Sequence, residues 1–266
     1  MIYCNLKGGM ANMLFQIAAA KSLAIDNNSE CNFPNLITHL NYLNGDNTHN
    51  PNLKHSSEYL LLLRNLKTKP CSNNTQYFLY PFEYTETKPI TNDVLIDGFF
   101  QSEKYFVHNR EEILKFINFD FIKKDYIDSE YNFLRTKRCT SIHVRRGDYL
   151  NFPQHHPIQT LEYYLKGIEL LKNKTDLFVI FSDDIEWCKE NLKLKNCVYI
   201  VDEKDYIELY LMSLCKHNII SNSSFSWWGA WLNKNKKKKV IGPNIWFGPA
   251  ITHNTSDIIP ETWIKI

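Results

Sequence analysis

The segment CTSIHVRRGDY, residues 139–149, decides the fold of this chain. Its first six residues are mostly apolar or β-branched, a composition that favours a β-strand. Two arginines, a glycine and an aspartate follow directly and end the apolar run. The segment is therefore predicted to be a strand that delivers charged side chains to one end of a sheet.

Beyond residue 149 the chain alternates between short apolar runs and stretches with helical periodicity. The segment 160–171 places five apolar side chains on one stripe, as expected for a helix that covers a sheet. Strands that alternate with helices in this way predict βαβ units and a parallel sheet. The stripe consists of Leu161, Tyr164, Leu165, Ile168 and Leu171. Strands are expected at residues 139–145, 177–181, 197–201, 218–221 and 240–241, and helices at residues 160–171, 185–192, 206–216 and 226–232.

The N-terminal half begins with a strand, a loop containing Gly8 and Gly9, and a helix. Residues 27–88 are mostly polar and show less regular periodicity. Because the regular alternation starts only near residue 139, two domains are predicted, at residues 1–135 and 136–266. The expected elements of the first domain are a strand at 2–6, helices at 12–24 and 59–66, a strand at 93–100 and a helix from Ser102.

Composition excludes several classes of protein. The chain has 266 residues, of which 44% are hydrophobic and 14% aromatic, enough for a packed core rather than a disordered chain. A net charge of +2 argues against nucleic acid as the main partner. Seven scattered cysteines indicate reduced core thiols, and neither a signal peptide nor a transmembrane segment is visible. These features predict a cytoplasmic protein.

Polar residues follow the predicted strands of the second domain at the point where each strand ends. In open parallel sheets, ligands bind outside the carboxyl ends of the strands. The side chains that collect at this edge are therefore candidates for a binding site. They are Arg145, Arg146 and Asp148; Ser182, Asp183 and Asp184; Asp202; and Asn222, Ser223, Ser224 and Ser226.

The residue types in this set suit a phosphate-containing ligand. The guanidinium group of Arg145 offers two parallel donors to phosphate oxygens. The serine-rich run 221–226 leads into a helix, whose free amide groups favour an anion. The carboxylates could accept hydrogen bonds from a ribose or a guanine edge. The residues by themselves thus predict a nucleotide site. They do not identify the group that is attached to the nucleotide.

Four segments carry a resemblance to a known family. Residues 143–149, HVRRGDY, resemble the H-x-R-R-G-D-Y motif of glycosyltransferase family 11, the α-1,2-fucosyltransferases. The other three are Gly8–Asn12 with Phe15 and Gln16, residues 98–106 (GFFQSEKYF) and residues 211–232 (LMSLCKHNIISNSSFSWWGAWL). The four segments follow the order found in the family and span nearly the whole chain.

The resemblance implies a GT-B-like α/β fold, with two Rossmann-type halves and a cleft between them. It implies that GDP-fucose binds the C-terminal domain, and that a galactose-terminated glycan acceptor approaches the N-terminal domain. The expected reaction is inverting transfer of L-fucose to a hydroxyl, O-2 of a terminal β-galactoside, without a metal or other cofactor. The alternatives are a related transferase with another linkage or GDP-sugar, and a catalytically silent nucleotide- or glycan-binding protein.

The resemblance and the residue chemistry together assign roles, each with a structural alternative. Arg145 is expected to bind phosphate, with a surface salt bridge as its structural alternative, and Arg146 either supports it or is structural. His143 either contacts the nucleotide or is a hydrogen-bonded core histidine. Ser223 and Ser224 either donate to phosphate or cap a helix. Asp183 and Asp184 either contact the ribose or cap the next helix, and Glu208 either reads guanine or is a solvated helix acid.

The general base is the least determined role. Asp148, His155 and His156 follow the arginine motif, and the departing phosphate itself is a further acceptor for the proton. By resemblance, Gly9 and Asn12 lie on a loop that faces donor and acceptor. Three further features are predicted to be structural: Trp227, Trp228 and Trp231 as core packing rather than a sugar platform, and the lysine-rich residues 234–239 as a solvated loop.

Overall fold

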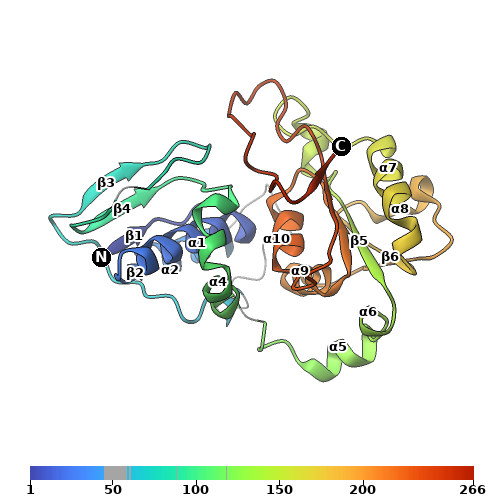
Figure 1. Cartoon of the computed structure of the whole chain (residues 1–266), viewed down its shortest axis with the longest axis horizontal. Helices are drawn as coiled ribbons and strands as arrows, with labels where there is room; N and C mark the ends of the chain where they lie inside the picture. Colours follow the sequence, from blue (N-terminus) through green and yellow to red (C-terminus); the bar gives the residue numbers. More distant parts are fainter. Residues whose placement is uncertain (45–58, 60, 88, 118) are drawn as a thin grey trace. The chain divides into compact units, whose positions relative to one another are not determined.

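The computed structural model describes residues 1–44, 59, 61–87, 89–117 and 119–266 (Figure 1). It divides into two compact units. Unit 1 comprises Met1–Phe121 and His253–Pro260, and unit 2 comprises Ile122–Thr252 and Glu261–Ile266. Residue 60 of the helix expected at 59–66 lies outside the described residues.

Unit 1 contains a four-stranded sheet in the order β2-β1-β4-β3, in which every pair of neighbours is parallel. The chain leaves β1 through α1 and pairs β2 on one side, while β4 pairs on the other side of β1. The order therefore reverses between β1 and β4. The strands are β1 (Ile2–Cys4), β2 (Cys31–Asn32), β3 (Gln76–Leu79) and β4 (Val94–Asp97). The helices are α1 (Met10–Asp26), α2 (Leu36–Asn44) and α4 (Arg110–Phe116), with 3-10 turns η2 (Glu103–Tyr105) and η3 (Val107–Asn109).

Unit 2 contains a six-stranded sheet in the order β10-β9-β8-β5-β6-β7, again with every neighbour parallel. One series runs outward from β5 through β6 to β7, and a second runs outward from β8 through β9 to β10, so the order reverses between β5 and β8. The strands are β5 (Cys139–Val144), β6 (Leu177–Ser182), β7 (Cys197–Tyr199), β8 (His217–Ile219), β9 (Val240–Gly242) and β10 (Ile264–Lys265). The helices are α5 (Lys124–Glu130), α6 (Phe133–Thr136), α7 (Leu161–Leu171), α8 (Ile185–Leu192), α9 (Asp205–Leu214) and α10 (Ser224–Leu232), with 3-10 turns η4 (Asp148–Asn151) and η5 (Lys172–Lys174).

The predicted α/β class with two parallel sheets is confirmed. In unit 2, Ile142, Ile180 and Ile219 from three neighbouring strands are fully buried in one core cluster. Helix α7 contributes Tyr164 to the same cluster. One position of the predicted stripe is wrong, because Leu165 is exposed. The buried face of α7 instead includes Tyr163 and Gly167. The centre of this face is therefore rotated about the helix axis away from Leu165.

Helix α10 is apolar on almost every side and lies in the core of unit 2. Trp227, Trp228 and Trp231 are buried, and their ring centroids lie 5.2–6.2 Å apart. Burial of these indoles confirms the prediction that they pack the core. The helix has no side-chain cap at its first turn, a feature that matters for the site described below.

The lysine-rich segment after α10 differs in part from its prediction as a solvated loop. Lys238 is half-buried, and its ammonium group donates to the carbonyl oxygens of Ala230 at 2.6 Å and Asn233 at 2.9 Å. It thereby satisfies acceptors at the carboxyl end of α10, where a cation is also favoured by the helix dipole. The other four lysines of this segment are exposed.

Helices α5 and α6 belong to unit 2, whereas the division at 135/136 assigned α5 to the first domain. The hydroxyl groups of Tyr126, on α5, and Tyr131 both donate to the carboxylate of Glu203, which precedes α9. These bonds, between residues more than 70 positions apart, attach α5 to the second sheet's unit. Among the described residues, no helix combines the length and apolarity needed to cross a bilayer.

Candidate functional site

The candidate site of unit 2 lies at the carboxyl ends of β5 and β8, where the strand order reverses. Reversal points of this kind are the usual ligand sites of open parallel sheets. Two hydrogen bonds join the loops that follow these strands. The Nδ1 atom of His143 lies 2.9 Å from the hydroxyl oxygen of Ser221, and the hydroxyl of Tyr149 donates to the carbonyl oxygen of Asn222 at 3.1 Å. The arginine motif and the serine-rich loop are therefore held side by side.

Arg145 is the first residue after β5, and its side chain is 22% exposed. One terminal nitrogen lies 2.7 Å from Asp148 and the other lies 3.1 Å from Asp183. The Tyr149 ring lies 5.5 Å from the guanidinium carbon. Carboxylates on two sides fix the orientation of the guanidinium fork at the strand end, so it is already placed before any ligand binds.

Arg146 points to different partners. Its Nε atom donates to Asp184 at 2.9 Å, and its guanidinium carbon lies 4.3 Å from the centre of the Trp187 ring. The second oxygen of Asp184 accepts from the backbone amide of Trp187 at 3.1 Å, which makes Asp184 the N-cap of α8. Of the alternatives for Asp184, the structure therefore contains the helix cap. Arg146 and Asp184 have the contacts expected of supporting residues.

Gly147 permits the loop to pass close to Asp183. A Cβ atom at Gly147 would lie 2.7 Å from the Oδ2 atom of Asp183, closer than real Cβ contacts allow. The other carboxylate oxygen of Asp183 accepts from the backbone amide of Arg146 at 2.9 Å. The side chain of Asp183 is only 12% exposed, so its charge acts mainly on Arg145 and on this loop.

His143 is buried beneath Arg145, within 5.6 Å of the Phe225 ring. Burial, together with the charge of Arg145, lowers the pKa of His143 to about 3. The imidazole is therefore neutral at any working pH. Its hydrogen bond to Ser221 gives it the partner expected of a core histidine, and the same bond ties β5 to β8.

The serine loop places a helix N-terminus at the same edge of the sheet. Ser223 is the N-cap of α10, yet its hydroxyl makes no capping hydrogen bond, and Ser224 is the first residue of the helix. The amide groups of the first turn are thus not capped by that side chain, and they carry the positive end of the helix dipole. Together with the guanidinium group of Arg145, they offer hydrogen-bond donors suited to phosphate oxygens.

Asn222 and Tyr149 position this site, although neither of them was assigned an individual role from the sequence. The side-chain amide of Asn222 donates to the carbonyl oxygens of Pro157 and Trp246, both at 2.9 Å. Tyr149 stacks on His156, with ring centroids 4.8 Å apart. Both residues were visible in the sequence as members of the strand-end set or of the arginine motif. Their anchoring role depends on partners far away in the chain.

The candidate bases differ in their surroundings. Asp148 is occupied by Arg145, and His155 is exposed. His156 is half-buried, and its Nδ1 atom is buried and makes no hydrogen bond within the described part of the chain. Burial lowers the pKa of His156 below its usual value of 6.5, although Asp148 opposes this shift. A neutral imidazole with an open nitrogen is chemically able to accept a proton.

Glu208 lies on α9 and is partly buried, which differs from the solvated helix acid weighed in the sequence. Burial raises the pKa of Glu208 to about 8, and the negative charges of Asp205, Glu203 and Asp183 raise it too. The carboxyl group is therefore largely protonated at neutral pH. A ligand that donates hydrogen bonds to Glu208 would favour its ionised form.

Gly9 and Asn12 belong to unit 1, so they are described separately from the candidate site of unit 2. Gly9 is the N-cap of α1, and the amide oxygen of Asn12 accepts from the side chain of Gln101 at 2.8 Å. Gly8 has φ of +75°, and a Cβ atom there would lie 2.6 Å from Asn12. The described residues contain no cluster of three or more His, Cys, Asp or Glu side chains that could hold a metal ion.

Known proteins resemble this chain in both sequence and fold. The sequence profile of Glycosyl transferase family 11 matches residues 49–266. An α-1,2-colitosyltransferase of Escherichia coli is 32% identical over 295 residues, which cover 100% of this chain and 98% of the relative. The human galactoside α-(1,2)-fucosyltransferase 1 is 26% identical over 158 residues, covering 52% of this chain and 42% of the relative.

Among solved structures, the α-1,6-fucosyltransferase NodZ of Bradyrhizobium, soaked with GDP-fucose, superposes with a TM-score of 0.50. The two chains share 12% identity, and the alignment covers 87% of this chain and 92% of NodZ. This similarity supports the GT-B-like fold and nothing finer. With the profile matching most of the chain and a relative aligned along its full length, the protein belongs to glycosyltransferase family 11.

Proposed function

We propose that this glycosyltransferase moves a deoxy sugar from a GDP-sugar to a hydroxyl group of a glycan acceptor, with inversion at the anomeric carbon. One observation carries the proposal. The preorganised guanidinium of Arg145 and the uncapped first turn of α10 lie at the ends of the neighbouring strands β5 and β8. Two sources of positive charge at one sheet edge suit the two phosphates of a nucleoside diphosphate.

The proposed chemistry places Arg145 where charge develops. As the bond between sugar and phosphate breaks, negative charge accumulates on the departing GDP. Fixed donors directed at that charge stabilise the transition state more than the ground state. In this mechanism Arg145, Ser223 and Ser224 neutralise the diphosphate, and neither a metal nor another cofactor takes part. Turnover is expected to persist in excess EDTA, and an activity restored only by Mg²⁺ or Mn²⁺ would contradict the mechanism.

The donor we propose first is GDP-L-fucose, which fits the fucosyltransferases among the relatives. GDP-colitose is the second candidate, because a colitosyltransferase aligns over the whole chain. The two sugars differ at carbon 3, where colitose lacks the hydroxyl group of fucose. Comparing kcat/KM for both donors in one competition assay decides between them. A preference for a third GDP-sugar would replace both.

The acceptor we propose is a terminal β-galactoside, with transfer to O-2. A panel of β-galactosides provides the test, and NMR of the product gives the linkage and the anomeric configuration. Tight GDP binding by calorimetry without transfer to any acceptor would instead favour a silent binding protein. The seven free thiols fit a reducing compartment, so we include a cytoplasmic location in the proposal.

For the general base we propose His156. Its Nδ1 atom is buried and makes no hydrogen bond among the described residues, whereas Asp148 is paired with Arg145. The Tyr149 ring against which it stacks also lies near the Arg145 guanidinium. The shared contact with Tyr149 supports the assignment of His156 as a proton acceptor near Arg145. The pH dependence that tests this assignment is described in the Discussion.

A further inference from the structure

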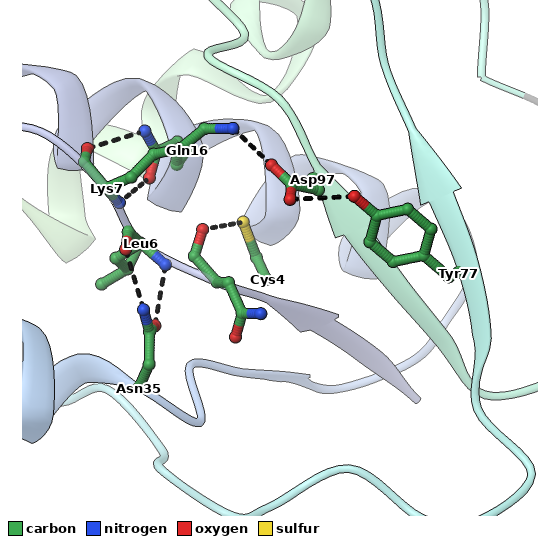
Figure 2. Close-up of polar contacts among 8 residues, drawn as sticks. Cys4, Leu6, Lys7, Gln16, Asn35, Tyr77 and Asp97 are labelled. Atoms are coloured by element: carbon green, nitrogen blue, oxygen red, sulfur yellow. Dashed lines mark hydrogen bonds and ion pairs between the residues drawn. The ribbon is translucent and has the colours of Figure 1, made fainter.

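A second group of polar side chains lies at the carboxyl ends of β1 and β4, the point where the strand order of unit 1 reverses. Figure 2 shows Lys7 and Tyr77 converging on the carboxylate of Asp97. The ammonium of Lys7 lies 2.5 Å from one oxygen of Asp97, and the hydroxyl of Tyr77 donates to the other at 3.0 Å. Asp97 is the last residue of β4, so the group occupies a ligand-binding position of a parallel sheet.

The loop that carries Lys7 is held by two side-chain amides, those of the half-buried Asn35 and the fully buried Gln16. Asn35 accepts from the backbone amide of Leu6 and donates to its carbonyl oxygen, both at 2.8 Å. Gln16 makes the same pair of bonds with the backbone of Lys7, at 2.9 and 3.0 Å (Figure 2). Four hydrogen bonds therefore fix the backbone of two consecutive residues. The fixed backbone holds the base of the Lys7 side chain in place beside Asp97.

The group retains hydrogen-bonding capacity that solvent can reach. The side chains of Asp97 and Lys7 are 24% and 38% exposed. A carboxylate can accept about four hydrogen bonds and an ammonium group can donate three, so the bonds of Asp97 to Lys7 and Tyr77 leave acceptor sites on Asp97 and donors on Lys7 for a ligand. The arrangement offers two oxygens and an ammonium group to an incoming polar molecule.

Aromatic rings lie next to these polar groups. The Lys7 ammonium is 4.8 Å from the centre of the partly exposed Phe99 ring, and the Phe99 ring is 6.4 Å from that of Phe82. Tyr77 is 57% exposed. A small number of fixed polar groups beside apolar aromatic surface is characteristic of small-molecule sites. For a pyranose ring, the hydroxyl groups suit the carboxylate and ammonium, and the C–H face suits the aromatic rings.

We propose that Asp97, with Lys7 and Tyr77, binds adjacent hydroxyl groups of the acceptor saccharide. The inference rests on the proposed function, because it makes unit 1 the acceptor-binding part of the same enzyme. The two carboxylate oxygens of Asp97 accept from two neighbouring hydroxyls, and the ammonium group of Lys7 orients the carboxylate. Asp97 is thus a determinant of acceptor affinity, and it takes no part in holding the donor.

The same strand supplies a matched control. Asp93 directly precedes β4, at the opposite end from Asp97, and its carboxylate also binds an ammonium group, that of Met1, at 2.9 Å, together with the Ser72 hydroxyl at 3.0 Å. Asp97→Asn is expected to raise the acceptor KM about tenfold, because a charged hydrogen bond is weakened. Its kcat and its calorimetric GDP affinity should stay within about twofold of wild type. Asp93→Asn should leave the acceptor KM unchanged, and equal acceptor KM values for the two variants would overturn the inference.

A direct binding measurement separates this inference from the proposed function. Saturation-transfer NMR of methyl β-D-galactoside and lactose with the full chain should give signals for wild type and Asp93→Asn, and weaker signals for Asp97→Asn. Absent wild-type signals, or undiminished signals for Asp97→Asn, contradict the saccharide site. A failure to turn over any GDP-sugar contradicts only the proposed function. Tyr77→Phe removes one exposed hydroxyl and should weaken binding about threefold, which keeps the test available if Asp97→Asn does not fold.

Discussion

The Nδ1 atom of His143 lies 2.9 Å from the hydroxyl oxygen of Ser221, and this buried hydrogen bond joins the ends of the adjacent strands β5 and β8. It connects the arginine motif to the serine loop, although the two residues are 78 positions apart in the chain. Together with the bond from Tyr149 to Asn222, it holds the two proposed phosphate-binding elements in position.

Ser221→Ala is expected to destabilise the protein by about 1–3 kcal/mol, because it leaves a buried imidazole nitrogen without its partner. Urea unfolding followed by circular dichroism measures the change. Ser213→Ala is a suitable control, since the Ser213 hydroxyl only donates to the carbonyl oxygen of Tyr210 within α9. Equal unfolding free energies for both variants would show that the His143–Ser221 bond contributes nothing specific.

Arg145→Ala is expected to lower kcat roughly 100- to 1,000-fold and to weaken GDP binding, because it removes a donor from the developing charge. Arg138→Ala is the matched control. Arg138 precedes β5, at the opposite end of the strand, and its partner is Asp176. Steady-state rates and calorimetry on both variants check the prediction. Retention of near-normal turnover by Arg145→Ala would remove the central assignment.

His156→Gln is expected to lower kcat about 100-fold near neutral pH, as removal of a general base does. The pKa of His156 is lowered, so the active, neutral form persists down to a pH below 6.5 and is lost only under more acidic conditions. The wild-type pH–rate profile should therefore show an acidic limb below pH 6.5, and the variant should lack it. His108→Gln, on the surface of unit 1, should keep the limb. If His155→Gln alone lacked the acidic limb of the pH–rate profile, His155 rather than His156 would be the general base.

Glu208→Gln is expected to make stability less dependent on pH. The pKa of Glu208 rises from 4.5 to about 8 on folding, so the folded protein holds a proton that the unfolded chain releases. Wild-type stability should therefore fall as the pH increases from about 4.5 to about 8. Calorimetric Tm values at pH 5 and pH 8 should differ less for Glu208→Gln than for wild type. The exposed Glu190→Gln should retain the wild-type difference, and a Glu208→Gln variant that did so too would contradict the shift.

The regular part of unit 2 was predictable from sequence because each of its elements leaves a local pattern. The strand expected at 177–181 is β6, and the helix expected at 185–192 is α8 with the same bounds. By contrast, β3 was not predicted, because its four residues are all exposed and show no alternation. The short strands β2 and β10 have two residues each, so pairing with a neighbour defines them rather than composition.

The candidate site was predictable to a similar degree. The rule for carboxyl ends of parallel strands placed Arg145, Asp183 and the serine loop at one edge, and the structure brings them together. The ion pair between Arg145 and Asp183 was not predictable, because it joins two loops whose spacing only the packed sheet sets. The ion pair between Lys7 and Asp97 was not predictable for the same reason, because the two residues are 90 positions apart in the chain.

Lys238 gives the lysine-rich segment after α10 an uneven chemical reactivity. An amine that donates to backbone carbonyl oxygens is shielded from acylating reagents, whereas Lys234, Lys236, Lys237 and Lys239 are open to them. In a lightly acetylated sample, mass spectrometry should then find the four exposed lysines of this segment modified and Lys238 unmodified. Because the protection of Lys238 ends when the last turn of α10 unwinds, its labelling rate reports the integrity of the helix whose other end faces the proposed phosphates.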